Sequence, residues 1–513
     1  MEHKRGPAAY IAGTVGISGA LLSLEWIRIT PSSPLEYLYI ALLGIALVPV
    51  SILLVSTAVY LGRGPASFPS SQITDWPSVA VLYVSYNDML PQAIAETLRN
   101  LDYPNAQVWL LSDSTRTELV AGEQALPGSV RIFRRRDRRG GKAGAINDWL
   151  RAEGEGFRFV VPMDADAILA KGTLRTLVET AAHPQNRRYA GFQTLMEIHP
   201  AVATTPFARI LGRGVKWGTR IVPLANQRLF GQGMYWGSNA LLRTDVVRSC
   251  GGWVEDNICE DFALTARLDA AGHPIALVDL YNYEGFPPDA LSLRERTIRW
   301  CKANLSVAPS LFRMDTSFAI RLNVVIPILF YAMAPTLLAL LLINMVAPPD
   351  VPLHRTSTIL GAVLLTFVFL HRLVVVPRKR VALKDFAATL VAETLVVLSM
   401  ALRISWAFVE NLFHSPTWTP SRKQARRMTP RSALRASIPE VSFGALLIAL
   451  IVIYRSPANS TILASVWIAS FLSTPVILWW SSRTSHSSYT YSRTRKYNIY
   501  SSSTSRKPIH PVR

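Results

Sequence analysis

The sequence predicts an α/β domain inserted between groups of membrane-spanning helices, and three observations support this fold class. The chain has 513 residues, of which 50% are hydrophobic and 17% are charged, whereas soluble domains carry about 25% charged residues. Apolar segments of the length that spans a bilayer as a helix lie toward both ends of the chain. Between them, residues 75–310 alternate short apolar runs with helical spacing, which is typical of a parallel, doubly wound sheet.

The composition excludes several other classes of protein. The apolar content is too high for a disordered or fibrous chain. The three cysteines are too few for a disulfide scaffold and suggest no zinc cluster. Lys and Arg number 54 against 34 Asp and Glu, a formal net charge of +20. A nucleic-acid binder therefore has to be weighed by where the positive charge lies.

Six apolar segments are predicted to span the membrane as three hairpins, in the regions 1–64, 318–377 and 437–481. The first segment could be a signal peptide, but Ser23-Leu24-Glu25-Trp26 is a poor cleavage site and a second span follows at once. The six segments are Ala8–Leu24, Tyr37–Leu61, Leu322–Ala347, Ser357–Val376, Ser437–Tyr454 and Thr461–Trp480.

The region 378–436 is predicted to lie on the membrane rather than to cross it. Its apolar stretch Phe386–Leu402 carries Glu393 at the middle, and a stretch rich in arginine follows. Crossing would place those arginines outside, against the positive-inside rule, so we expect an amphipathic helix in the plane of the interface and a basic cytoplasmic loop. The α/β domain and both termini are then cytoplasmic, in a multi-pass protein of the plasma (inner) membrane.

The basic tail at 482–513 is rich in serine and is predicted to be disordered. With the tail and the basic loop both at the inner leaflet, anionic lipid accounts for much of the net charge. The lipid bilayer is therefore the expected partner of these charges, and we expect no nucleic-acid partner.

Within the α/β domain, the residues that follow predicted strands are the candidates for ligand binding. Ligands of such sheets bind beyond the carboxyl ends of the strands. Asn87 and Asp88 follow the first run, Asp113 the second, and Asp164 and Asp166 the fourth. The predicted strands are Val79–Tyr83, Gln107–Leu111, Val130–Phe133 and Phe157–Met163, and the predicted helices between them are Pro91–Leu101 and Lys142–Ala152.

The strongest single motif is Asp164-Ala165-Asp166. Two carboxylates one residue apart at a strand end can share a divalent cation such as Mg²⁺ with substrate phosphates. A helix N-cap or a solvated turn is the alternative, and it is the commoner explanation of an isolated pair of this kind.

A basic run, Arg131–Lys142, ends in a Gly-Gly turn that leads into a helix. A glycine-flanked helix start surrounded by cations suits a diphosphate, so Lys142 and Gly144 are candidate ligands. The outer arginines of the run are predicted to form a positively charged face against the bilayer.

Two later motifs are ambiguous when taken alone. Glu260 and Asp261 open a predicted helix, Phe262–Ala271, where an acidic pair is usually a cap, although a carboxylate beside a sugar hydroxyl can act as a general base. Arg296-Thr297-Ile298-Arg299-Trp300 precedes a predicted span, where Arg and Trp often serve as interfacial anchors.

In combination and in this order, the motifs resemble the inverting family 2 glycosyltransferases, which use a nucleotide-sugar-binding domain of the GT-A type. The membrane-embedded β-glucan synthases, and among them the osmoregulated periplasmic glucan glucosyltransferases, are the more similar group. The motifs are Tyr86-Asn87-Asp88, Leu111-Ser112-Asp113, Gly141-Lys142-Ala143-Gly144, Asp164-Ala165-Asp166, Tyr235-Trp236-Gly237-Ser238-Asn239-Ala240, Glu260-Asp261, Tyr283-Glu284 and Arg296-x-x-Arg299-Trp300.

The resemblance implies a role for each candidate residue in transferring glucose or a related hexose from a UDP-sugar to a growing glucan. Asp113 would contact the uracil, and Asp164 and Asp166 would hold the ribose and diphosphate through Mg²⁺ or Mn²⁺. Asp261 would be the general base, with Glu260 as its neighbour. The other donor-site residues would be Asn87, Asp88, Lys142, Gly144, Arg296 and Arg299, and the acceptor-site residues Trp236, Asn239 and Trp300.

Some features depart from the related families and leave alternatives open. Arg296 stands where many cellulose and chitin synthases have Gln, and the chain is shorter than typical periplasmic glucan enzymes. A non-processive enzyme acting on a lipid-linked acceptor would use the same donor site. A non-catalytic membrane scaffold is the alternative of another class, and the acidic residues at the predicted site argue against it.

Overall fold

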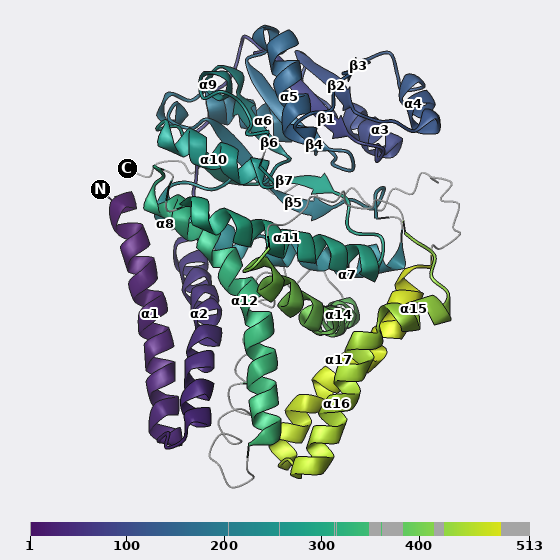
Figure 1. Cartoon of the computed structure of the whole chain (residues 1–513). Coiled ribbons are helices and arrows are strands. Elements are labelled where there is room, and N and C mark those ends of the chain that lie inside the picture. Colours follow the sequence, from purple (N-terminus) through teal and green to yellow (C-terminus); the bar gives the residue numbers. More distant parts are fainter. Residues whose placement is uncertain are drawn as a thin grey trace.

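The structure is a computed structural model that describes residues 2–203, 205–255, 257–311, 313, 315–347, 361, 383–414 and 425–483. An α/β domain lies at one end of a set of long helices (Figure 1). Three helices of the central part of the chain separate the sheet from the long helices: α7 (Pro206–Gly218), α8 (Ile221–Phe230) and α11 (Ala290–Leu311).

Seven strands form a single sheet in the order β3-β2-β1-β4-β6-β5-β7. The first four are parallel, and they confirm the four predicted strands to within two residues at each end. The strands are β1 (Val79–Ser85), β2 (Ala106–Ser112), β3 (Val130–Arg134), β4 (Phe159–Asp164), β5 (Gly191–Ile198), β6 (Ala240–Arg243) and β7 (Ile275–Glu284).

The four predicted strands are parallel, as expected, and the sheet as a whole is mixed. Strand β6 runs antiparallel to both of its neighbours, β4 and β5. The backbone N–H of Asn239, just before β6, donates to the carbonyl of Pro162 near the carboxyl end of β4. Because β6 starts at the edge where β4 ends, it can only run in the opposite direction.

Alternate residues of the central strands enter two apolar cores, one on each face of the sheet. Val79, Val81 and Tyr83 of β1 belong to one core, and Ala80 and Leu82 belong to the other. This period of two, with both faces buried, is what a sheet covered by helices on both sides requires. The covering helices are α3 (Pro91–Asn100), α4 (Thr117–Gln124), α5 (Gly141–Ala152), α6 (Thr173–Ala182), α9 (Thr244–Ser249) and α10 (Glu260–Ala270).

Long apolar helices flank the α/β domain in the sequence. Among the described residues, five helices are long and apolar enough to cross a membrane, or up to six if α15 and α16, which meet at 66°, form one broken span. The predicted span Ser357–Val376 lies outside the described residues except for Gly361. The helices are α1 (Glu2–Ile29), α2 (Pro34–Arg63), α12 (Phe318–Val346), α14 (Leu383–Asn411), α15 (Pro430–Ala436), α16 (Ile438–Tyr454) and α17 (Ala458–Ser481).

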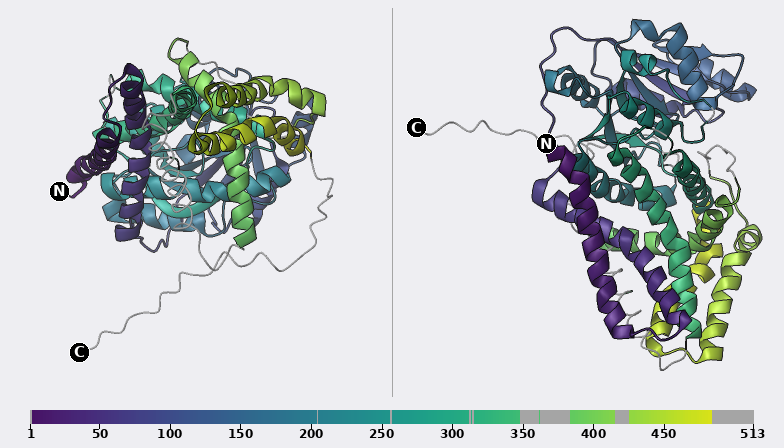
Figure 2. Two further views of the ribbon diagram at one scale, coloured as in Figure 1. Left: turned by 90° about the horizontal axis from the view of Figure 1, so that it is seen from below. Right: turned by 60° about the vertical axis from the view of Figure 1, so that its left-hand side comes forward.

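Helix α14 lies across the other long helices, beneath α7 and α11. It is seen nearly end-on in Figure 1 and at full length in the view from below in Figure 2. A Cβ atom on Gly214 of α7 would lie 1.4 Å from Oε1 of Glu393. The acid in the middle of this apolar helix therefore reaches the backbone of a helix of the α/β domain. The in-plane position relative to a membrane stays a prediction.

Candidate active site

A cavity of about 800 Å³ opens at the carboxyl ends of β1, β2 and β4 and is also walled by α10, α11 and α12. It brings together residues from widely separated parts of the sequence. Among the candidates named above, the residues that line it are Asp88, Asp113, Lys142, Asp164, Asp166, Trp236, Glu260, Asp261, Arg296, Arg299 and Trp300.

Among the described residues, three of the predicted site residues are not part of this lining. Asn87 holds a turn, because its Oδ1 accepts hydrogen bonds from two backbone N–H groups of the next loop. Gly144 lets the start of α5 pack on the loop after β3, since a Cβ there would lie 2.1 Å from the carbonyl oxygen of Arg139. Asn239 is fully buried and donates to Oε1 of Glu284 at 3.1 Å.

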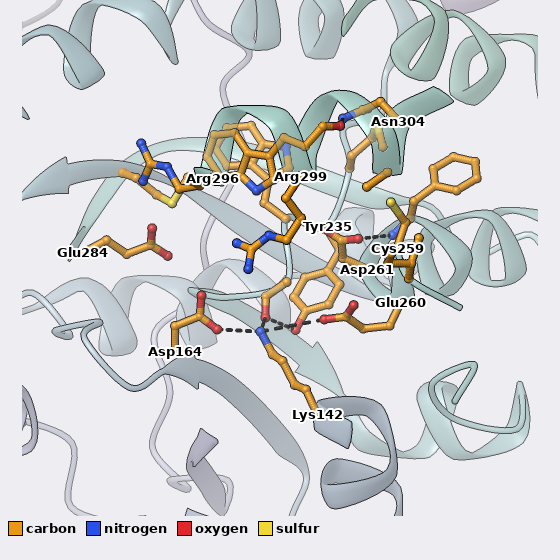
Figure 3. A pocket seen from close by; sticks show the side chains of 18 of the residues that line it. Lys142, Asp164, Tyr235, Cys259, Glu260, Asp261, Glu284, Arg296, Arg299 and Asn304 are labelled. Atoms are coloured by element: carbon orange, nitrogen blue, oxygen red, sulfur yellow. Dashed lines mark hydrogen bonds and ion pairs between the residues drawn. The ribbon is translucent and has the colours of Figure 1, made fainter. Parts of the chain in front are cut away.

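Lys142 lies at the start of α5 and points into the middle of the cavity (Figure 3). Its Nζ donates to Oδ1 of Asp164 at 2.6 Å and to the carbonyl oxygen of Gly237 at 2.8 Å. Oε1 of Glu260 lies 4.0 Å from the same nitrogen. Burial alone would lower the pKa of Lys142, but the neighbouring carboxylates outweigh it and raise the pKa, so the side chain stays cationic.

Glu260 and Asp261 open α10 on the opposite side of the cavity from Asp164 (Figure 3). Burial and the adjacent charge of Asp261 raise the pKa of Glu260 to about 7. Burial also raises the pKa of Asp261, whose Oδ1 accepts from the backbone N–H of Phe262 at 2.8 Å. A carboxylate made more basic in this way is suited to accept a proton near neutral pH.

The Asp113 carboxylate is paired with an arginine that the sequence did not single out. Nε and Nη2 of Arg135 donate to its two oxygens at 2.8 and 2.7 Å, and the same guanidinium bonds Asp148. Both members of the pair are almost fully buried. This bidentate pair fixes the loop after β3 against the end of β2.

The expectation that the outer arginines of this run face the bilayer was wrong. Arg134 pairs with buried Glu123 and donates to the carbonyl of Ser114, and Arg138 donates to the carbonyl of Asp113. Strand β3 also lies at the end of the sheet far from the long helices (Figure 1). The arginines find acidic and carbonyl partners within their own domain, and sequence spacing does not reveal such partners.

Asp164 and Asp166 both line the cavity, as a shared cation requires. The described residues contain no group of three His, Cys, Asp or Glu that could hold a metal by itself. Two carboxylates fit Mg²⁺ or Mn²⁺ when substrate phosphates complete the coordination. Gly285 packs on this pair, because a Cβ there would lie 2.3 Å from Oδ2 of Asp166.

Helix α11 brings two cations and an aromatic ring over the cavity. The Arg296 guanidinium stacks 5.1 Å from the ring centre of Phe286 and 4.6 Å from that of Trp300. Burial lowers the pKa of Arg296 to about 10 although Glu284 and Asp166 oppose the shift. Its Nε is buried and has no hydrogen-bond partner among the described residues. A buried cation with a free donor is suited to an anionic ligand.

Two further residues that sequence reasoning did not place in the site lie in the cavity wall. Tyr235 is fully buried, and its hydroxyl donates to the carbonyl of Gly237, which Lys142 also binds. Glu284, at the end of β7, lies beside Arg296 (Figure 3). Both residues belong to motifs that resemble the glycosyltransferases, and that resemblance is the sequence feature that could have identified them as site residues.

Part of the chain is similar to known glycosyltransferases. Residues 159–376 match the family model described as "Glycosyl transferase family group 2". Over these residues, which are fewer than half of the chain, the protein is similar to the family 2 glycosyltransferases, and its mixed seven-stranded α/β domain is GT-A-like.

Among curated proteins, it is similar to the glucans biosynthesis glucosyltransferase H of Vibrio cholerae, with 25% identity over 60% of this chain and 47% of the relative. The protein of the same name from Shewanella baltica is 26% identical over 63% of this chain and 48% of the relative. The chain thus spans about half the length of the curated relatives it matches.

Solved structures similar to this one include a mannosyltransferase, PcManGT from Pyrobaculum calidifontis, in complex with GDP-Man and Mn²⁺. It has 18% identity and a TM-score of 0.49, covering 74% of this chain and 99% of that one. S. aureus TarS in complex with UDP-GlcNAc has 14% identity and a TM-score of 0.31, covering 65% and 89%.

Proposed function

We propose that this protein transfers glucose, or a related hexose, from a UDP-sugar to a growing β-glucan, with inversion at the anomeric carbon. The observation that carries the proposal is that acidic and basic groups from widely separated segments of the chain line one cavity, with Asp164 and Asp261 on opposite sides of it. The similarity to glucan glucosyltransferases supports glucose as the hexose and a glucan as the acceptor.

The donor diphosphate would bind between Asp164, Asp166 and the cations of α5 and α11. Mg²⁺ or Mn²⁺, held by the two aspartates, would neutralise charge on the diphosphate. Lys142 and Arg299 point toward the same space, and Arg296 keeps a free buried donor there. Preorganised charge of this kind is usually the largest catalytic contribution.

Asp261 would take the proton from the attacking hydroxyl of the acceptor. Asp261 lies on the side of the cavity opposite Asp164. Inversion requires this, since the acceptor hydroxyl must attack opposite the leaving diphosphate. Burial makes the carboxylate of Asp261 a stronger base. Trp300, which is 45% exposed, would stack on the acceptor sugar.

The long helices would carry the product across the plasma (inner) membrane, with the α/β domain and both termini in the cytoplasm. A sugar polymer cannot cross hydrocarbon unaided, and the cavity is walled partly by α12, one of the helices able to span a membrane. Sealed vesicles given UDP-sugar on one side should accumulate glucan on the other side. Glucan found only on the side to which the UDP-sugar was added would contradict export.

The catalytic proposal is tested by Asp261→Asn in the full-length protein. Loss of a general base typically costs 10²- to 10⁴-fold in rate, so transfer should fall by at least about a hundredfold while UDP binding is kept. Asp245→Asn is the matched control, because Asp245 is 56% exposed and pairs with Arg158 at the surface. An Asp261→Asn enzyme with near-normal turnover would remove Asp261 from the role.

A non-processive transferase with a lipid-linked acceptor is the second candidate function, favoured by the apolar residues of α12 in the cavity wall. Product length separates the two functions. A polymer from a soluble primer supports glucan synthesis, and a single sugar on a lipid supports the alternative. A scaffold without catalysis would release no UDP under either condition.

A further inference from the structure

The cavity continues beyond Asp261 to the place where α8 meets α12. Cys259 and Phe262, which flank the acidic pair of α10, pack in one apolar cluster with Ile320 and Val324 of α12. This end of the cavity is lined mainly by apolar side chains, and its polar members on α8 and α12 are two asparagines. The lining residues from α8 and α12 are Val222, Pro223, Asn226, Asn323, Val324, Ile326 and Pro327.

The two asparagines form a hydrogen-bonded pair between the helices. Nδ2 of Asn226 donates to Oδ1 of Asn323 at 2.8 Å. Asn226 is 4% exposed and Asn323 is 9% exposed. Within the described part of the chain, Oδ1 of Asn226 and Nδ2 of Asn323 are buried without a hydrogen-bond partner. The pair therefore keeps one acceptor and one donor unused.

The presence of one unused donor and one unused acceptor does not depend on which amide atom is assigned as oxygen and which as nitrogen. Exchanging oxygen and nitrogen in both side chains preserves the bond between them. It again leaves one donor and one acceptor over. A buried polar group without a partner destabilises the fold, and an apolar pair of similar shape would avoid that cost. A purely structural contact between the helices explains the bond but not the two leftover groups.

An alcohol, like water, can satisfy both groups. A hydroxyl donates one hydrogen bond and accepts others, and neighbouring hydroxyls on a sugar ring can meet a donor and an acceptor at once. A lipid chain can do neither. The site lies on the side of Asp261 that faces α12, where the already formed part of an acceptor would extend.

We infer that Asn226 and Asn323 form a subsite for the hydroxyl groups of the acceptor sugar chain, at the junction of the α/β domain and the long helices. The inference rests on the proposed function, and it adds a polar contact point for the glucan behind the sugar unit that reacts. Removal of the contact weakens acceptor binding and leaves the donor site unchanged.

The experiment replaces both side chains in the full-length enzyme, as Asn226→Leu together with Asn323→Leu. Loss of both polar partners, replaced by apolar groups of similar size, is mild for folding. The KM for a soluble β-glucan oligosaccharide should rise about tenfold, as expected when hydrogen bonds worth about 1.4 kcal/mol are lost. UDP binding and hydrolysis of the UDP-sugar in the absence of acceptor should not change, and these measurements also report that the variant is folded.

Asn344→Leu is the matched control, because Asn344 lies on the same helix, is 2% exposed and bonds the carbonyl of Leu340. Asn323→Ser keeps a shorter polar group and should raise the same KM by a smaller factor, which gives a second variant if the double replacement fails to fold.

Three outcomes separate the possibilities. A double variant with wild-type KM for the oligosaccharide overturns the subsite while the proposed function stands. A wild-type enzyme that extends a lipid-linked acceptor and not the oligosaccharide overturns the assignment of the subsite to a glucan. A wild-type enzyme that transfers no hexose from any UDP-sugar overturns the proposed function itself.

Discussion

The ammonium group of Lys142 donates a 2.6 Å hydrogen bond to Oδ1 of Asp164. The bond joins the start of α5 to the end of β4 and places a fixed positive charge at the carboxyl edge of the sheet. Glu260 lies on the other side of the same charge. Lys142 therefore links the acids proposed to bind the donor with the acids proposed to activate the acceptor.

The first prediction is that Lys142→Met moves the acid limb of the pH profile of kcat to higher pH. The base must be deprotonated, so activity falls as the pH drops toward the pKa of the acidic pair, which for Glu260 is about 7. The charge of Lys142 lowers the pKa of both Glu260 and Asp261. Its removal raises both values, and the limb shifts upward. The exposed Lys171→Met is the control, and an unshifted limb in Lys142→Met would refute the coupling.

The second prediction concerns the backbone that packs on Asp166. Gly285→Ala would place a Cβ 2.3 Å from Oδ2 of Asp166 and so displace the carboxylate. Altered support of a metal ligand typically costs 10- to 100-fold in metal affinity, so the Mg²⁺ or Mn²⁺ concentration for half-maximal activity should rise about tenfold or more. Gly156→Ala is the control, since a Cβ there meets nothing within 4 Å. Full activity of the wild type in excess EDTA would contradict the metal role of Asp166.

The third prediction is that Arg135→Met destabilises the α/β domain. The substitution removes the bidentate partner of buried Asp113 and the bond to Asp148. Removing one member of a buried ion pair costs about 3–5 kcal/mol, which denaturant unfolding of the purified protein should detect. Arg136→Met, an exposed change in the same loop, should stay within about 0.5 kcal/mol. Equal stability of the two variants would show that the Asp113–Arg135 pair is not an important support.

The fourth prediction concerns Glu440, a fully buried acid at the start of α16. Its Oε1 accepts from Arg403 of α14 at 2.7 Å and from Arg294 of α11 at 3.4 Å. Glu440→Gln leaves two cations without their shared charge partner, so the melting temperature in detergent should fall by several degrees.

Glu410→Gln is the control for Glu440, because the Glu410–Lys302 pair is more exposed and exposed pairs contribute little. An unchanged melting temperature for Glu440→Gln would contradict the idea that this carboxylate holds α11 against α14 and α16.

The sequence predicted the parts of the site that lie at the ends of regular elements. Asp113 and Asp164 follow apolar strands, and Lys142 follows a glycine turn, so local pattern and general α/β geometry place them in one cavity. The position of Asp261 came from resemblance, because an acidic pair at a helix start is ordinary.

Long-range pairing could not be predicted in the same way. The partner of Asp113 is Arg135, 22 residues later, and spacing alone could not choose among the arginines of that run. The direction of β6 depends on a long-range bond, from the N–H of Asn239 to the carbonyl of Pro162 in β4. The pairing of Asn226 with Asn323 joins residues 97 positions apart.

The part of the cavity wall that comes from α12 means that the α/β domain is not a portable module. A fragment ending at residue 310 would keep Lys142, Asp164 and Asp261 but would lose Asn323, Val324 and Pro327 from the far wall. Bulk water would then reach the base from that side and compete with the sugar as nucleophile. Under the proposed function, α12 would also keep water away from the donor sugar, so an excised domain should hydrolyse a UDP-sugar faster than the whole chain does.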